Sequence, residues 1–170
     1  MEDLMLHRIL NKIHRHFAIG EASAHCDIPC GIYDPHQAQV AALTVIRMCD
    51  LIADATKAEP ADKVEFQNSM TRYIMVKEEH AELAKREVRV IFGDFIKKEH
   101  VEKYPELPEL QHKIMQYGSK ARQTASRANA VDLLKAVNRF AEIFWEIKGV
   151  KTKLVKAPYK PEEEVVYPIL

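Results

Sequence analysis

Four stretches of this chain carry apolar residues at helical spacing, and breaker residues separate the stretches. Apolar side chains that recur three or four positions apart share one face of a helix. The four stripes are formed by Ala41, Val45, Met48, Ile52 and Ala55; by Phe66, Met70, Tyr73, Ala81, Ala84, Val88, Ile91 and Phe95; by Leu110, Ile114, Tyr117, Ala121 and Ala125; and by Leu134, Val137, Phe140, Phe144 and Ile147. No sustained apolar–polar alternation is present, so strands are not required. We therefore predict an all-α, up-and-down four-helix bundle, in which the stripes are buried together.

Local signals predict where these helices begin and end. Asp34-Pro35 supplies an N-cap followed by Pro at the first helical position. The second helix should cover about residues 62–98. Asn129 should cap the fourth helix, and Gly149 should end it.

Composition excludes several classes of protein. A length of 170 residues suits one domain with a real core. The 25 basic and 25 acidic residues leave no overall basic footprint, so we expect no nucleic-acid partner. No stretch approaches the roughly 18 uninterrupted apolar residues of a membrane span, so we expect no membrane partner either. Three cysteines are a poor disulfide framework.

Residues 1–24 form a distinct leader. Leu6, Ile9 and Ile13 fall on one helical face, but charged and polar residues interrupt every apolar run, which is wrong for a secretory signal. Without an export signal, we expect a cytoplasmic protein. The leader ends in Ala22-Ser23-Ala24, which has the small-x-small pattern of a processing site. We predict a removable pro-segment, and the alternative is an N-terminal helix that stays on the protein.

His25, Cys26 and Cys30 follow the leader directly. If the chain is cut after Ala24, His25 gains a free α-amine. That amine, the backbone nitrogen of Cys26 and the two thiolates then form a planar N2S2 set, with the His25 imidazole as an axial ligand. Such a set selects Ni(II) or Cu(II) over tetrahedral zinc. In the uncut chain the same nitrogen is an amide, and the site lacks a ligand.

Other uses of these three side chains are weaker. They would underfill a structural zinc site, which takes four ligands. A disulfide between Cys26 and Cys30 is possible, but it would close a very small loop. We therefore divide the chain into a pro-segment (1–24), a metal-binding hook with the four-helix bundle (25–149) and a C-terminal arm (150–170). The arm is rich in proline and is expected to be extended, without a core of its own; it could wrap a neighbouring subunit.

The segment from His25 to Pro35, HCDIPCGIYDP, resembles the nickel hook of nickel superoxide dismutase. Residues 77–85, 102–107 and 143–146 resemble other landmarks of that family in the same order. The resemblance implies an enzyme that disproportionates superoxide to oxygen and hydrogen peroxide through a Ni(III)/Ni(II) cycle. It also implies one nickel ion per subunit, assembly into a homohexamer and removal of the leader by a maturation peptidase.

The resemblance assigns roles to five residues. His25, Cys26 and Cys30 match the nickel ligands. Tyr33 matches the tyrosine beside the open face of the metal, where it screens access and orders water. Asp27 matches a hook residue whose backbone lines the same small pocket.

Three positions depart from the family pattern. Ala41 and His80 stand where better-known members have a Glu and an Arg that orient the axial imidazole, and Phe95 replaces a second tyrosine. His80 either takes over the orienting role or is a hydrogen-bonded histidine of the bundle. Cys49, beside an apolar stripe, is expected to be a buried small hydrophobe.

Two further questions stay open at this point. Lys85, Arg86 and Arg89 either steer the superoxide anion or form a solvated helical face. The alternative to the enzyme is a non-catalytic helical bundle whose hook binds metal or senses thiol oxidation.

Overall fold

The computed structural model describes residues 31–57 and 59–170, and residues 31–170 form one compact unit. Its elements, in chain order, are α2 (His36–Ala55), α3 (Lys63–Val90), the π-helical turn η1 (Ile91–Phe95), α4 (Lys98–Lys103), α5 (Leu107–Gln123), α6 (Arg127–Ile147), β1 (Thr152–Lys156) and β2 (Glu164–Pro168). The predicted pro-segment and the hook residues His25, Cys26, Asp27 and Cys30 lie outside the described residues.

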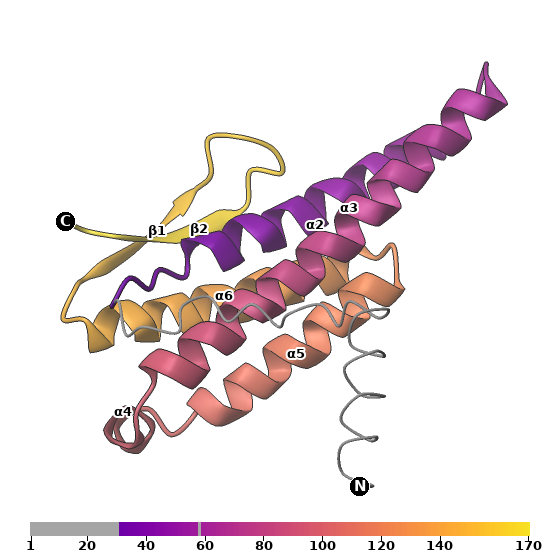
Figure 1. Ribbon diagram of the computed structural model, residues 1–170. Helices are drawn as coiled ribbons and strands as arrows, with labels where there is room; N and C mark the ends of the chain where they lie inside the picture. Colours follow the sequence, from indigo (N-terminus) through magenta and orange to yellow (C-terminus); the bar gives the residue numbers. More distant parts are fainter. Residues whose placement is uncertain (1–30, 58) are drawn as a thin grey trace, which may run out of the picture. The chain divides into compact units, whose positions relative to one another are not determined.

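The four long helices form a closed bundle. Helix α2 packs against α3 and α6, and α5 packs against the same two helices, so each helix contacts its neighbours in the chain (Figure 1). All four helices contribute to one buried core, which includes Ile46, Val88, Ile114, Phe140 and Phe144. The predicted up-and-down four-helix bundle is therefore confirmed.

Two of the helix starts test the predicted caps. The side chain of Asp34 accepts the backbone N–H of His36 at 2.8 Å, as the Asp34-Pro35 signal predicts. The fourth helix is capped by Ser126 rather than by Asn129, because the Ser126 hydroxyl accepts the N–H of Asn129. Asn129 lies in the first turn of α6 and donates to Thr124. The predicted Asn129 cap was wrong by three residues.

The helix ends are set by backbone conformation. After α6 the chain leaves the helix through Gly149, whose φ is +73°, so the predicted stop is confirmed. The second helix ends earlier than the expected residue 98. It widens into the π-helical turn η1, and Ile96 is already extended. Ala125 lies beyond the end of α5 and is exposed.

Helices α3 and α5 approach closely at Gly118. A Cβ atom at this position would lie 2.6 Å from the side-chain carbons of Lys85, so only glycine fits without a shift. One turn further along α5, the buried amine of Lys77 donates to the carbonyls of Ala121 (3.0 Å) and Arg122. A cation that caps the last carbonyls of a helix also interacts favourably with the helix dipole.

The C-terminal arm contains a β-hairpin, which the sequence analysis did not predict. Strands β1 and β2 pair antiparallel, from Thr152 opposite Pro168 to Lys156 opposite Glu164. Val165 and Val166 are fully buried against the bundle, so the arm shares the core of its own chain. Both valines are adjacent in a five-residue strand, and the strand is too short to show an alternating pattern.

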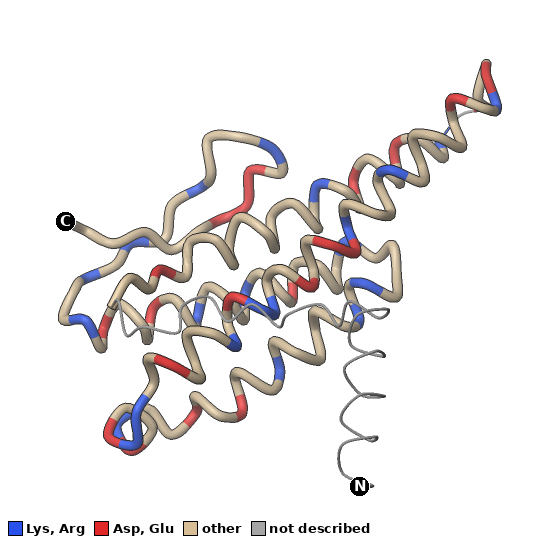
Figure 2. The backbone as a smooth tube through the Cα atoms, in the orientation of Figure 1, with Lys and Arg blue, Asp and Glu red and all other residues tan. Residues whose placement is uncertain are grey.

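Two further observations concern the distribution of charge and the lengths of the described helices. Basic and acidic residues are interspersed along the described helices (Figure 2). Within residues 31–57 and 59–170, no helix is both long and apolar enough to cross a membrane.

Candidate metal centre

The segment Gly31–Asp34 joins the hook sequence to α2. Gly31 has a φ of +70°, in the left-handed region that only glycine adopts without strain. No described atom lies within 4 Å of the place where a Cβ atom would be. The described part of the chain therefore begins with a backbone conformation that favours glycine.

Tyr33 rests on an aromatic cluster at one end of the bundle. Its ring centroid lies 5.8 Å from that of Phe95 in η1, with the planes tilted by 44°. Phe95 in turn contacts Phe144 of α6 at 4.9 Å and stacks on His100 of α4 at 5.5 Å. The amine of Lys148 lies 4.7 Å from the Phe95 centroid, in cation–π contact. Tyr33, the candidate site tyrosine, thus packs on Phe95, which side chains from α4 and α6 hold in turn.

The two other departures from the family pattern lie inside the bundle. Ala41 is buried in the core and offers no polar group. His80 is half-buried on α3, and its Nδ1 lies 2.9 Å from the carbonyl oxygen of Val76 in the same helix. Because a carbonyl only accepts, Nδ1 carries the proton in this contact. The contact favours the bundle-histidine interpretation of His80.

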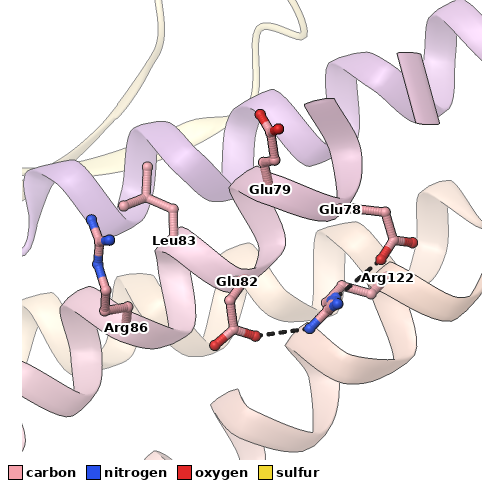
Figure 3. A pocket seen from close by; sticks show the side chains of 6 residues that line it. All are labelled: Glu78, Glu79, Glu82, Leu83, Arg86 and Arg122. Carbon is pink, nitrogen blue, oxygen red and sulfur yellow. Dashed lines mark hydrogen bonds and ion pairs between the residues drawn. The ribbon is translucent and has the colours of Figure 1, made fainter. Parts of the chain in front are cut away.

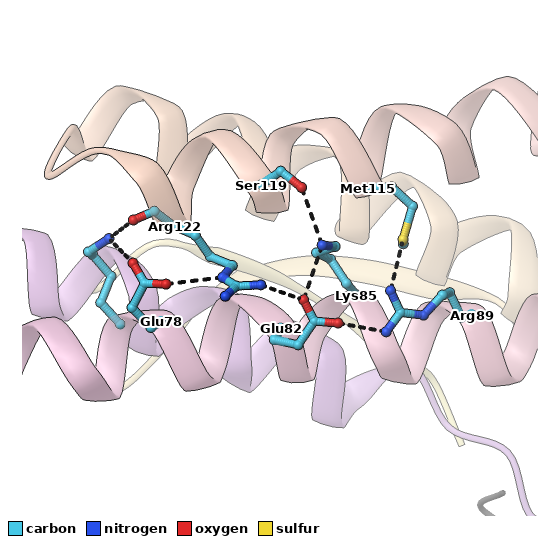
Figure 4. Close-up of polar contacts among 8 residues, drawn as sticks. Glu78, Glu82, Lys85, Arg89, Met115, Ser119 and Arg122 are labelled. Atoms are coloured by element: carbon cyan, nitrogen blue, oxygen red, sulfur yellow. Dashed lines mark hydrogen bonds and ion pairs between the residues drawn. The ribbon is translucent and has the colours of Figure 1, made fainter. Parts of the chain in front are cut away.

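The three candidate steering residues are held in ion pairs within α3, where Lys85 and Arg89 pair with Glu82 and Arg86 pairs with Glu87. Glu82 accepts from Arg89 at 2.7 Å, from Arg122 at 2.9 Å and from Lys85 at 3.1 Å (Figure 4). Burial raises the pKa of Glu82, but hydrogen bonds from Arg89 and Lys85 outweigh it and hold that pKa below its ordinary value. The charges of Lys85 and Arg89 are therefore largely compensated, which favours a structural role.

An open groove runs along the same seam (Figure 3). Its volume is about 380 Å³, and it is lined by Glu78, Glu79, Glu82, Leu83, Arg86 and Arg122. Three carboxylates face two guanidinium groups, and Arg122 already pairs with Glu78 and Glu82. The groove has no net positive charge to attract an anion, so it is a poor entrance for superoxide.

The described residues contain no alternative metal site. Among residues 31–57 and 59–170, no three His, Cys, Asp or Glu side chains are grouped so that they could hold a metal ion. Cys49 is buried in α2, and this burial raises the pKa of its thiol, so the expectation of a buried small hydrophobe is confirmed. The candidate ligands remain His25, Cys26 and Cys30.

The family assignment comes from residues 20–148, which match the family model for nickel-containing superoxide dismutase. This segment includes the hook sequence and all four helices of the bundle. The chain belongs to the nickel-containing superoxide dismutase family.

Relatives and solved structures agree with the assignment. The nickel superoxide dismutase of Streptomyces coelicolor is 39% identical over 126 residues, which are 74% of this chain and 89% of the relative. That of Streptomyces seoulensis is 36% identical, over 75% and 91% of the two chains. The native nickel superoxide dismutase structure at 1.30 Å superposes with a TM-score of 0.65 at 36% identity, over 74% of this chain and 99% of that one.

The candidate ligands could be proposed from the sequence because the hook sequence is contiguous. Two features of the described structure were not predicted from the sequence. The cation–π contact of Lys148 joins residues more than fifty positions apart, and no local pattern marks it. The hairpin β1–β2 follows residue 148, beyond the matched segment, so the resemblance gave no guide to it.

Proposed function

We propose that this chain converts two superoxide anions and two protons into oxygen and hydrogen peroxide, at a nickel ion held by His25, Cys26 and Cys30. The activity and the metal follow from membership of the family. The observation that carries the ligand assignment is that the hook sequence lies inside the matched residues 20–148.

The donor set fits nickel. Two thiolates, an α-amine and a backbone nitrogen would supply a strong-field set of four donors that suits Ni(II) better than zinc, and the His25 imidazole would add a further nitrogen donor. When bound, one nickel ion per subunit supplies a Ni(III)/Ni(II) couple that takes an electron from one superoxide and returns it to the next. The left-handed conformation of Gly31 is compatible with this proposal, because glycine adopts it without strain.

The remaining residues act on access and protons. The Tyr33 ring, held against Phe95, is proposed to screen the open side of the metal and to order the water that supplies protons to the product. The backbone of Asp27 is proposed to line the same pocket. Neither residue needs to become covalently attached to substrate.

Maturation is part of the same proposal. Removal of residues 1–24 by a peptidase would create the α-amine ligand at His25. We further propose a homohexamer, as the resemblance implies, with 25–149 as hook and bundle and 150–170 as the C-terminal arm. A cytoplasmic location rests on the charged residues that interrupt the apolar runs of the leader.

Mass spectrometry of the protein from its native host tests the proposal. We expect a chain that begins at His25 and carries one nickel ion. The matched variants Cys26→Ser and Cys30→Ser should lose dismutase activity, because a neutral hydroxyl cannot replace a thiolate ligand. An active protein that still begins at Met1 would contradict the ligand set. A retained leader with a Cys26–Cys30 disulfide would instead support the redox-sensing alternative.

A further inference from the structure

The β-hairpin is an addition to the family's bundle, yet it is firmly attached. The matched segment ends at residue 148, and the native structure at 1.30 Å is 99% covered by 74% of this chain. The hairpin begins where the N–H of Val150 donates to the carbonyl of Trp145 at 2.9 Å. It closes where the N–H of Ile169 donates to the carbonyl of Lys151 at 2.8 Å. Both strands also contact α6, and Val165 and Val166 are buried, so the hairpin has a defined position on the bundle.

Gln39 joins the hairpin to the first turns of α2. Its side chain is buried, and its amide nitrogen donates to the carbonyl of Val166 in β2 at 3.1 Å and to Asn138 of α6 at 2.9 Å. Asn138 donates in turn to the carbonyl of Glu164 at 2.8 Å. One pair of side-chain amides therefore ties together α2, α6 and β2. Breaking it would leave buried polar groups without partners, which is costly.

Tyr167 makes the second contact with α2. Its ring lies 5.6 Å from that of His36, the first residue of the helix. The N–H of His36 is bound to the side chain of Asp34, and Asp34 directly follows Tyr33. The first N–H groups of a helix lack partners within the helix, so this turn depends on such outside contacts. The hairpin thus holds the turn from which Tyr33 extends.

We infer that the hairpin is a positioning element for the metal site. By fixing the first turn of α2, β2 fixes where the segment that carries Tyr33 joins the bundle. Tyr167 and Gln39 are the positioning residues. The link to nickel rests on the proposed function, whereas the link to α2 does not.

Amide hydrogen exchange on the full chain without nickel tests the link to α2. Tyr167→Ala and Gln39→Ala should speed exchange of residues 36–42 by about tenfold or more, because opening of this turn then needs less free energy. Leu154→Ala is the matched control, since it truncates a half-exposed apolar residue on the opposite strand of the hairpin. Unchanged exchange of residues 36–42 in both test variants would overturn the inference.

Nickel release from the matured protein tests the link to the metal. Tyr167→Ala should lose nickel to a chelator several times faster than wild type, and Tyr167→Phe should restore the slow rate because it keeps the ring against His36. Ile114→Val, a substitution in the core, is the control for a general loss of stability. Release from this variant and from Tyr167→Ala is compared at the same interval below the Tm of each. Equal release rates in Tyr167→Ala and this control would overturn the link to the metal. If wild type binds no nickel, the proposed function fails, and the exchange experiment still decides whether the hairpin fixes α2.

Discussion

The ring of Tyr33 lies against the ring of Phe95, with 5.8 Å between their centroids. Tyr33 matches the family's site tyrosine, and Phe95 stands where a second tyrosine is expected. The pair keeps aromatic packing between these two positions, although Phe95 carries no hydroxyl group. Proton supply near the metal should therefore depend more strongly on Tyr33 than on Phe95.

Tyr33→Phe should retain nickel and change the handling of substrate or peroxide. The variant keeps the ring on Phe95 and removes only the hydroxyl group. Nickel content by elemental analysis and the dismutase rate by pulse radiolysis check this. Phe95→Tyr is the complementary variant, and it should also keep nickel. Complete nickel loss in Tyr33→Phe would show that its hydroxyl group supports metal binding and that the access role is wrong.

Gly118→Ala should destabilise the bundle by about 1–3 kcal/mol, the usual cost of overpacking a close contact. The new methyl group would lie 2.6 Å from the Lys85 side chain and would displace its amine from Glu82 and Ser119. Gly93→Ala is the matched control, because no described atom lies within 4 Å of that position. Urea denaturation measures both variants. Equal stabilities for the two would contradict the close approach of α3 and α5.

Lys77→Met should lower the free energy of unfolding by about 1.5–3 kcal/mol, the range for hydrogen bonds made by charged groups. The substitution keeps the long side chain but leaves the carbonyls of Ala121 and Arg122 without their donor. Lys63→Met, at the exposed start of the same helix, should have little effect. Thermal unfolding of the two variants compares them directly, and a neutral Lys77→Met would refute the capping role.

Acid should weaken the ion pairs of Glu82, which join it to Lys85 and Arg89 within α3 and to Arg122 of α5. Its pKa is lower in the folded chain than the ordinary value of 4.5, because Arg89 and Lys85 bind the carboxylate despite its partial burial. A lowered folded pKa gives stability that is fully present above pH 4.5 and is lost as the pH falls through the folded pKa. The Tm difference between wild type and Glu82→Gln should therefore shrink in acid. A difference that stays constant from pH 7 to pH 3 would count against this.

Sequence alone determined the features that depend on near neighbours in the chain. The apolar stripes predicted the bundle, since helical spacing places them on one face, and Asp34 and Gly149 marked helix ends through contacts within a few residues. The hook was found for the same reason, because its candidate ligands lie within six residues.

Only the tertiary structure decided the features that join distant parts of the chain. Gln39 is hydrogen-bonded to Asn138, 99 positions away, and to Val166, 127 positions away. No local pattern therefore marks where the hairpin packs on the bundle. The choice of Ser126 over Asn129 as the cap also needed the fold, since both residue types cap helices well. Burial of Lys77 follows from the carbonyls of α5, which reach it only when the two helices pack.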